Sequence, residues 1–332
     1  MPDVRLPDVG FIGLGNMGLP MAGRLIDAGH EVRGFDVSDS ARAEFAARGG
    51  KAAGSAAEAA RDAGLVILML PDSNVVEAVA TSPSFVAALT ATSSPGAASP
   101  GAVVVDMSSS EPERTRQLAH FLREHGARLV DAPVSGGVKG AVSGRLAVMV
   151  GGDDEDVRRV EDVLASLGKI YRAGPVGAGH AVKALNNLMS ATHLLVTSEA
   201  MLAGQRFGIE PDVMLAIFNA SSGRSGSTEN KWPNFILPET YDSGFGLRLM
   251  LKDMRIATGL AGQMGSPSRL GEQAAAMWAK AADDLPAAAD HTEIARWLRD
   301  SQLGRLPVGR LPPKGTVATA GLSIPRELRG MP

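Results

Sequence analysis

The 332-residue sequence predicts an α/β domain built on a parallel sheet, followed by an all-α domain that a long interdomain helix joins to it. Short apolar segments alternate with helical patterns up to about residue 174, as expected for a parallel sheet covered by helices. The stretch 178–206 then keeps a helical pattern for its whole length, and no convincing strand follows it. We therefore divide the chain into an α/β domain (1–174), a helical domain (175–302) and a proline-rich tail (303–332) that we expect to be extended.

Six short apolar segments in the first domain predict buried strands, because parallel strands covered on both faces are continuously apolar. Gly29 provides a natural stop for the first predicted helix. The Ser-, Pro-, Ala- and Gly-rich segment Thr81–Gly101 predicts a short helix followed by a surface loop. The predicted strands are Val9–Gly13, Glu31–Phe35, Leu65–Leu70, Val103–Val105, Arg128–Val130 and Ala147–Val150, and the predicted helices are Asn16–Ala28, Ala41–Arg48 and Arg114–His125.

Helical periodicity continues through the second domain. Aromatic residues make up only 4% of the chain, so its core must rest on Ala, Val, Leu, Ile and Met, which favours close helix packing. The apolar faces of the long helix and of the Ala-rich helices predict a homodimer or a homotetramer. The predicted helices are Ala178–Arg206, Asp212–Asn219, Gly246–Met264 and Pro267–Asp283.

Composition excludes several classes of function. The net charge of -3, without any basic block, gives no electrostatic footprint for nucleic acid. The chain has no cysteine, which removes disulfides, thiolate catalysis, iron–sulfur clusters and cysteine zinc sites, and no other ligand cluster indicates a metal. No apolar run reaches the roughly 20 residues of a membrane helix, and the N-terminus does not resemble a secretory leader. We expect a cytoplasmic protein.

The first predicted strand and helix enclose a glycine pattern that is typical of dinucleotide binding and predicts a Rossmann-type domain. The first glycine permits the tight turn, the second lets pyrophosphate approach the backbone, and the third lets helix and strand pack closely. The free N–H groups of the helix N-terminus attract the phosphates. The residues of this cradle are Gly13, Leu14, Gly15, Asn16, Met17 and Gly18.

Asp36 ends the second predicted strand, 18 residues after Gly18. A carboxylate at this place accepts hydrogen bonds from the ribose hydroxyls of the adenosine and repels a 2′-phosphate. We therefore expect NAD as the cofactor, although Arg33 and Arg42 lie close enough in the sequence to leave NADP possible. A second role for Asp36 as a turn or helix-capping residue is compatible with the first.

Two further patterns carry candidate chemistry. Ser135 opens a glycine turn after a strand, where backbone N–H groups can bind a carboxylate, although an ordinary strand exit has the same pattern. Lys183 and Asn187 lie four residues apart on the long helix, so their side chains face the same way, and Ser190 shares that face. A buried lysine with a lowered pKa can exchange a proton with an alcohol, whereas a surface lysine only covers apolar neighbours with its stem.

Six motifs in order resemble the β-hydroxyacid dehydrogenase family, which includes 3-hydroxyisobutyrate dehydrogenase and tartronate semialdehyde reductase. The similarity runs from about Val9 to about Ala282. The segment 83–100 is longer than the usual connection, and the tail after Leu303 is extra. The motifs are Gly13-x-Gly15-x-x-Gly18, Leu70-Pro71, Asp106-x-Ser108-Ser109, the run from Asp131 through Ser135-Gly136-Gly137, Lys183-x-x-Asn186-Asn187 and Lys252-Asp253.

The resemblance implies an active site between the Rossmann domain and a helical domain like that of 6-phosphogluconate dehydrogenase. Lys183 would be the general acid and base, and Asn187 would hold the substrate oxygen. The other implied roles are carboxylate binding by Ser135, Gly136 and Gly137, a pocket wall at Phe245, and cofactor contacts by Leu70, Pro71, Ser109 and Lys252. Ser109 stands where many members of the family have threonine, which weakens the assignment of its hydroxyl.

The resulting hypothesis is an NAD-dependent oxidoreductase that acts on a small 3-hydroxy acid similar to 3-hydroxyisobutyrate. Reduction of tartronate semialdehyde or a related semialdehyde is an alternative, and a dinucleotide-binding scaffold without activity is a more distant one. Lys183 argues against imine reductases, and Asn186 replaces the histidine usual in 6-phosphogluconate dehydrogenases. We expect the pocket residues in 222–232 to decide among substrates that differ by a methyl or a hydroxyl.

Overall fold

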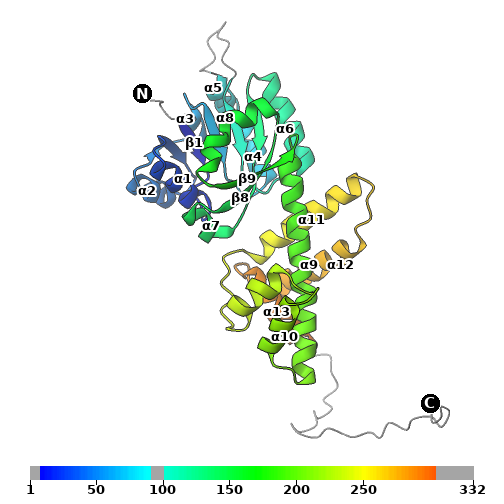
Figure 1. The fold of residues 1–332 in the computed structure, drawn as a ribbon. Helices are drawn as coiled ribbons and strands as arrows, with labels where there is room; N and C mark the ends of the chain where they lie inside the picture. Colours follow the sequence, from blue (N-terminus) through cyan, green and yellow to red (C-terminus); the bar gives the residue numbers. More distant parts are fainter. Residues whose placement is uncertain (1–7, 91–100, 304–332) are drawn as a thin grey trace, which may run out of the picture.

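The computed structural model describes residues 8–90 and 101–303. Within them, a mostly parallel nine-stranded sheet leads into a helical domain, and the helix α9 (Ala178–Phe207) extends from one to the other (Figure 1). This arrangement confirms the predicted fold class. The loop expected over residues 91–100 and the extended tail from residue 304 lie outside the described residues.

All six predicted strands are present, and none of their ends is shifted by more than two residues. The sheet has the order β3-β2-β1-β4-β5-β6-β8-β7, and the neighbours from β3 to β6 are parallel. Strand β8 pairs antiparallel with β6 and β7 and parallel with β9. The six strands are β1 (Val9–Ile12), β2 (Val32–Phe35), β4 (Leu65–Leu68), β5 (Val103–Asp106), β6 (Arg128–Asp131) and β8 (Leu146–Gly151).

Three strands were not predicted: β3 (Lys51–Ala52), β7 (Val134–Ser135) and β9 (Gly168–Gly174). The first two have two residues each, too few for an apolar pattern. β9 has seven residues, but none of its side chains is fully buried, so it lacks the continuous apolar run of a central strand. Patterns of burial cannot indicate such strands, because their pairing depends on neighbours that are distant in sequence.

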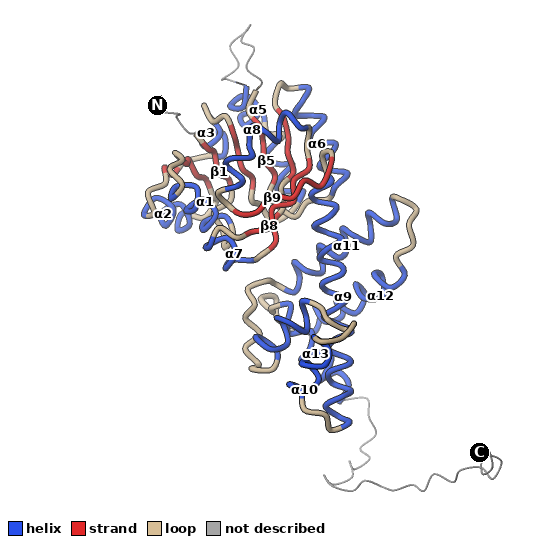
Figure 2. The backbone as a smooth tube through the Cα atoms, in the orientation of Figure 1, coloured by secondary structure: helices blue, strands red, loops and turns tan. Residues whose placement is uncertain are grey.

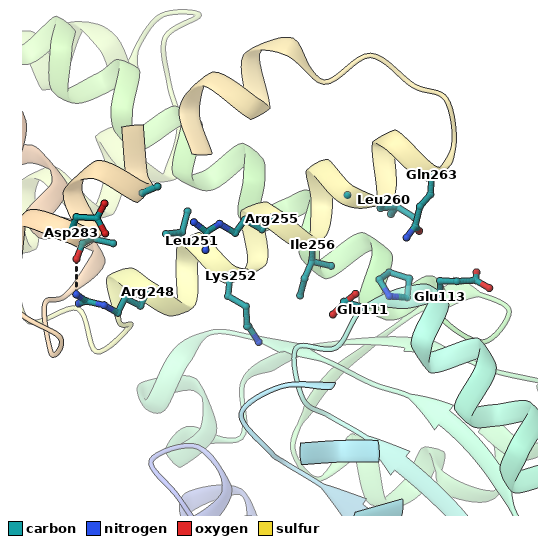
Figure 3. A pocket seen from close by; sticks show the side chains of 14 residues that line it. Glu111, Glu113, Arg248, Leu251, Lys252, Arg255, Ile256, Leu260, Gln263 and Asp283 are labelled. Atoms are coloured by element: carbon teal, nitrogen blue, oxygen red, sulfur yellow. Dashed lines mark hydrogen bonds between the residues drawn. The ribbon is translucent and has the colours of Figure 1, made fainter. Parts of the chain in front are cut away.

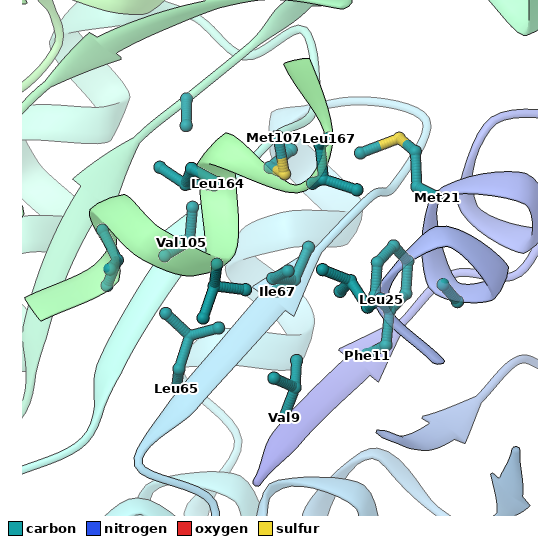
Figure 4. Close-up of a cluster of buried hydrophobic side chains, with 14 of the residues drawn as sticks. Val9, Phe11, Met21, Leu25, Leu65, Ile67, Val105, Met107, Leu164 and Leu167 are labelled. Atoms are coloured by element: carbon teal, nitrogen blue, oxygen red, sulfur yellow. The ribbon is translucent and has the colours of Figure 1, made fainter. Parts of the chain in front are cut away.

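Helices cover both faces of the sheet (Figure 2). Adjacent residues of a strand point to opposite faces, so Phe11 packs in the core with Leu25 and Ile67 (Figure 4), whereas Ile12 packs in a second core with Phe85. The helices are α1 (Gly18–Asp27), α2 (Asp39–Ala47), α3 (Ala56–Ala60), α4 (Ser73–Ala80), α5 (Pro83–Thr90), α6 (Pro112–Glu124), α7 (Gly137–Ser143) and α8 (Asp154–Ala165).

The short helix expected after Thr81 is α5, whereas α3, α4, α7 and α8 were not predicted. α8 did carry a readable signal. Its first turn is acidic, which suits a helix N-terminus, and its buried residues recur at helical spacing from Val157 to Leu164.

The helical domain gathers around the second half of α9 (Figure 1). Its core contains Trp232 and Trp278, both almost fully buried. The segment expected to decide the substrate leads into a π-helix, which the sequence did not predict. None of the described helices is long and apolar enough to cross a membrane. The elements are α10 (Pro211–Asn219), the π-helix η1 (Ser227–Ile236), α11 (Leu247–Gln263), α12 (Arg269–Asp284), the short η2 (His291–Glu293) and α13 (Ile294–Leu303).

Candidate functional site

The glycine cradle lies at the carboxyl end of β1, and a different physical requirement explains each of its three glycines. Gly13 has a φ of 97°, and a Cβ there would lie 2.1 Å from the carbonyl oxygen of Met69. A Cβ on Gly18 would lie 1.8 Å from the carbonyl oxygen of Gly13, so the start of α1 can approach β1 only without a side chain. A Cβ on Gly15 would have no heavy atom within 4 Å. Packing therefore explains Gly13 and Gly18, whereas Gly15 borders open space.

The N-terminus of α1 faces the same space. Met17 is its N-cap residue and no side chain caps the helix. The N–H of Leu19, the second residue of α1, donates to the carbonyl of Gly15 in the cradle at 3.0 Å. An uncapped helix N-terminus beside an open glycine suits the binding of a pyrophosphate.

Asp36 lies beside this cradle, at the end of β2. One carboxylate oxygen accepts the N–H of Leu14 at 2.7 Å and the other accepts the N–H of Ser38 at 2.8 Å. Each oxygen retains a free lone-pair direction for a ligand. The guanidinium of Arg42 donates to the backbone carbonyl of Asp36 and also pairs with Asp39, so its donors are engaged near the carboxylate.

The loops after β4 and β5 meet a lysine from the helical domain. Lys252 of α11 donates to the carbonyl of Pro71 at 3.0 Å and to the carbonyl of Ser109 at 2.7 Å. The contact of Ser109 is therefore made by its backbone. The sequence predicted no contact for the side chain of Ser108. Its hydroxyl accepts the N–H of Leu70 at 2.9 Å and so holds the two loops together.

A cavity of about 580 Å³ lies between the start of α6 and the helices α11 and α12 (Figure 3). Lys252 extends from α11 toward the α/β domain on its wall, and charged side chains such as Glu111 and Arg255 line it. Of the site residues predicted from the sequence, Lys252 alone lines this cavity. The cavity therefore adjoins the meeting point of the two domains without containing Lys183 or Asn187.

Lys183 is buried on α9, with 8% of its surface exposed, so it is not the surface lysine that the sequence left possible. Among the described residues, no hydrogen bond or ion pair engages its ammonium. Burial lowers the pKa of Lys183, and the nearby cation Lys252 lowers it further, while the carboxylate of Asp253 opposes both. Such a lysine has its hydrogen bonds available for a ligand and exchanges protons more readily than an ordinary one.

Asn187 lies one helical turn beyond Lys183 and is also buried. Its side-chain amide donates to the carboxylate of Asp253 at 2.6 Å, and its oxygen accepts from Asn186 at 3.1 Å. Asp253 also lies 3.6 Å from the ammonium of Lys252. Asp253, known from the sequence only as the neighbour of Lys252, therefore holds Asn187 and raises the pKa of Lys183 by its charge.

The Ser135 turn connects β7 and α7. Gly136 and Gly137 have φ values of 126° and 60°, which L side chains rarely adopt, and both are exposed. Two residues later, the ammonium of Lys139 lies 5.8 Å from the ring centre of Phe235 in η1. The helix that follows the glycine turn therefore contacts the π-helix of the other domain.

Phe245 precedes α11 and packs partly buried against the helical core. Its ring lies 5.8 Å from that of His291 in an edge-to-face arrangement, and its N–H donates to Asp290 at 3.2 Å. Its hydrogen bonds and ring contact among the described residues are thus with Asp290 and His291, not with Lys183 or the Ser135 turn.

The first turn of α9 is fastened to the sheet. The buried carboxylate of Asp131 accepts the N–H groups of Gly177 at 2.7 Å and His180 at 2.9 Å. His180 also shares a hydrogen bond with Thr115 at 2.8 Å. His180 therefore helps to hold the start of α9 against the sheet and α6. No group of three or more metal-ligating side chains occurs within residues 8–90 and 101–303.

A parallel sheet with a glycine cradle, an uncapped helix and an acid after β2 defines a dinucleotide-binding protein. Residues 8–202 match the family model described as the NAD binding domain of 6-phosphogluconate dehydrogenase. Residues 177–298 match the model described as NAD-binding of NADP-dependent 3-hydroxyisobutyrate dehydrogenase.

Relatives agree over most of the chain. A 2-(hydroxymethyl)glutarate dehydrogenase of Eubacterium barkeri is 38% identical over 75% of this chain and 80% of its own. The mitochondrial 3-hydroxyisobutyrate dehydrogenase of Bos taurus is 35% identical over 89% and 87%. The structure of a Mycobacterium tuberculosis 3-hydroxyisobutyrate dehydrogenase with L-serine is 34% identical, with a TM-score of 0.79 over 89% of this chain and 99% of that one. The chain belongs to the 3-hydroxyisobutyrate dehydrogenase family of β-hydroxyacid dehydrogenases, and it is an NAD(P)-dependent dehydrogenase acting on CH–OH groups.

Proposed function

We propose that the protein oxidises a small 3-hydroxy acid with NAD and that Lys183 is the general acid and base of the reaction. The observation that carries this proposal is the buried ammonium of Lys183, which has no acid or carbonyl bonded to it among the described residues. A buried cation without a partner is costly. A substrate oxygen that shares a proton with it would supply the missing interaction.

Asn187 would hold the same substrate oxygen, with Asp253 fixing its orientation. An amide that donates to Asp253 at 2.6 Å and accepts from Asn186 at 3.1 Å is held in one orientation. The N–H groups of Gly136 and Gly137, with the hydroxyl of Ser135, would bind the substrate carboxylate. Phe245 would form part of the pocket wall when the domains close on the substrate.

The residues of the cradle fit a dinucleotide, because the open side of Gly15 and the uncapped start of α1 suit a pyrophosphate. Gly13 and Gly18 shape this cradle, while Leu14, Asn16 and Met17 would contribute backbone to it. Leu70 and Pro71 would flank the nicotinamide, and Lys252 would reach it from α11 together with Ser109. When bound, NAD accepts the hydride that leaves the carbinol carbon.

We propose NAD rather than NADP as the preferred cofactor. The carboxylate of Asp36 would accept the ribose hydroxyls and repel a 2′-phosphate. Arg42 is engaged by the carbonyl of Asp36 and by Asp39, which leaves it poorly placed to pair with that phosphate. Use of NADP at lower efficiency is compatible with this arrangement.

The proton follows a short route. In oxidation, the neutral amine of Lys183 accepts the hydroxyl proton as the carbonyl forms, and in reduction its ammonium returns that proton. The oxidising direction therefore requires the deprotonated form. The lowered pKa of Lys183 makes this form accessible nearer to neutral pH than in an ordinary lysine.

Among substrates, 3-hydroxyisobutyrate is our first choice, because several relatives at about 35% identity are named for it. A reductase of tartronate semialdehyde remains the alternative. A scaffold without activity is disfavoured, because it has no need for an unpartnered buried lysine.

The test is Lys183→Met, which keeps the length of the side chain and removes the proton-carrying group. We expect oxidation of 3-hydroxyisobutyrate to fall by at least 1,000-fold, on the order of the general acid–base contribution, while NADH binding changes little. Lys280→Met, on the exposed face of α12, is the matched control and should retain activity. Substantial activity in Lys183→Met would overturn the assignment.

Three expectations stay predictions. The division at residues 174 and 302 is retained as our domain proposal. The exposed apolar side chains Val182, Leu185 and Met189 on one part of α9, with Phe207 at its end, support a homodimer or homotetramer. A cytoplasmic location is likewise proposed from the sequence.

A further inference from the structure

A second lysine, Lys231 of η1, contacts the stripe of α9 that carries the proposed catalytic pair. Lys231 of η1 donates to the hydroxyl of Ser190 at 2.8 Å. Ser190 follows Asn187 by three residues and Lys183 by seven, so all three side chains share one helix face. The ammonium of Lys231 is therefore held about one turn, ~5 Å along the axis, beyond Asn187.

The charge of Lys231 is not neutralised by an ion pair with any described residue. The nearest acid that acts on it is Asp290, whose carboxylate is already occupied by donors from Ser243, Gly244, Phe245 and Thr292. Hydrogen bonds with His291 and Thr292 hold the pKa of Asp290 far below its usual range although burial opposes them. The only hydrogen-bond partner of Lys231 among the described residues is thus a neutral hydroxyl.

Polar side chains surround the ammonium of Lys231. Burial lowers the pKa of Lys231 to about 8, and the charge of Asp290 opposes this. Burial also lowers the pKa of His291, and Lys231 contributes to that shift, so this imidazole is neutral near neutral pH. Both Lys231 and Ser190 are half-buried rather than enclosed, so a ligand can reach them.

The Ser135 turn leads into α7, and α7 contacts the same helix η1 that carries Lys231. Phe235 lies four residues after Lys231 in η1, and the ammonium of Lys139 approaches its ring at 5.8 Å. η1 and α7 therefore meet across the gap between the domains. A substrate held by the glycine turn at one carboxylate and by Lys183 at its hydroxyl would extend toward Lys231.

We infer that Lys231 and Ser190 form a second anion subsite and that the preferred substrates are dicarboxylic 3-hydroxy acids, with the distal carboxylate bound by the ammonium of Lys231. This inference rests on the proposed function, because it uses Lys183 to locate the reacting hydroxyl. An arm of two methylenes and a carboxylate spans about the one helical turn, ~5 Å, between Asn187 and Ser190. The oxidation itself is unchanged: the carbinol C–H bond breaks with hydride transfer to NAD, and the O–H proton passes to Lys183.

The test uses three acids that differ only in one substituent of C2: 3-hydroxyisobutyrate with a methyl group, 2-(hydroxymethyl)pentanoate with a propyl group and 2-(hydroxymethyl)glutarate with a carboxyethyl group. For the wild-type enzyme, kcat/KM should be about 10- to 100-fold higher for the glutarate than for the pentanoate, the worth of one charge-assisted hydrogen bond. In Lys231→Met this preference should disappear. Lys231→Arg should keep most of it, and Lys280→Met should keep all of it.

The outcomes separate the two proposals. Equal kcat/KM values for the glutarate and the pentanoate in the wild type would overturn the second subsite and leave the proposed function standing. The same holds if Lys231→Met keeps the wild-type preference. If none of the three acids is oxidised, the proposed function fails and this inference falls with it. The wild-type comparison requires no variant, so poor folding of Lys231→Met does not prevent a decision.

Discussion

Gly15 offers a sharp test of the cofactor cradle, because its side-chain position is open in the protein itself. A methyl group at Gly15 would meet no heavy atom within 4 Å. By contrast, a methyl group at Gly18 would lie 1.8 Å from the carbonyl oxygen of Gly13. Gly15→Ala and Gly18→Ala therefore add the same atom to the same motif with opposite structural consequences.

The expected magnitudes follow from these distances. Gly15→Ala should change the free energy of unfolding by no more than about 0.5 kcal/mol, as for a surface substitution without a clash. The added methyl should hold the pyrophosphate away from the amides of α1, and the loss of one charge-assisted hydrogen bond costs about 1.5–3 kcal/mol, or roughly 10- to 150-fold in Kd. Gly18→Ala should instead cost about 1–3 kcal/mol of folding stability, because the backbone of Gly13 must shift.

Two measurements distinguish the variants: thermal unfolding without cofactor, and titration with NADH followed by its fluorescence. Gly15→Ala should unfold at the wild-type temperature and bind NADH weakly, and saturating NADH should raise its Tm less than that of the wild type. Gly18→Ala should have a lower Tm before any cofactor is added. Wild-type affinity for NADH in Gly15→Ala would refute the placement of the pyrophosphate over Gly15.

Three further predictions concern charge. Because burial lowers the pKa of Lys183 and oxidation needs the neutral amine, the rate should rise with pH and level off below the range of an ordinary lysine; a flat pH–rate profile from neutral to alkaline pH would contradict this. Asp253→Asn removes a carboxylate that raises the pKa of Lys183, so the rising limb of the pH–rate profile should move to lower pH. The weakened hydrogen bond to Asn187 should also lower kcat about tenfold. If the rising limb does not move, Asp253 has only a packing role. Asp36→Ala should raise the ratio of NADP to NAD efficiency by about tenfold or more as the repulsion of the 2′-phosphate is lost, measured as kcat/KM for both cofactors.

The central strands and long helices could be predicted from the sequence because their burial is continuous or periodic. β1, with all four residues buried, and α9, with buried residues along its length, have such patterns. β3 and β7 have two residues each, and β9 has no fully buried residue, so nothing local distinguishes them from loops. The π-helix η1 contains Pro233 and depends on packing within the helical domain, which no local pattern reports.

In the candidate site, too, the sequence could predict residues that lie close together in one element but not contacts between distant elements. The glycine cradle and the Lys183–Asn187 pair have fixed spacing within one element, and the sequence predicted both. Asp253 reaches Asn187 from a helix 66 residues away, and Lys231 reaches Ser190 from 41 residues away. A signal did exist for Asp253, since it is the only acid of α11 and lies between the apolar residues Leu251 and Met254, where a carboxylate needs a partner. Its partner could not be named before α9 and α11 were seen side by side.

Asp131 couples the two halves of the candidate site. It ends β6, four residues before Ser135, and its carboxylate binds the N–H groups of Gly177 and His180 in the first turn of α9. Lys183 lies one turn beyond His180, so one buried side chain fixes both the strand exit that leads to the glycine turn and the helix that carries the lysine. Burial raises the pKa of Asp131, which shows how strongly it is removed from water, and the charge of His180 partly offsets this. The position of Lys183 relative to the Ser135 turn, where we propose that the substrate carboxylate binds, is thus fixed through Asp131. Lys231 and Phe245, the residues that would select among substrates, are contributed by the helical domain.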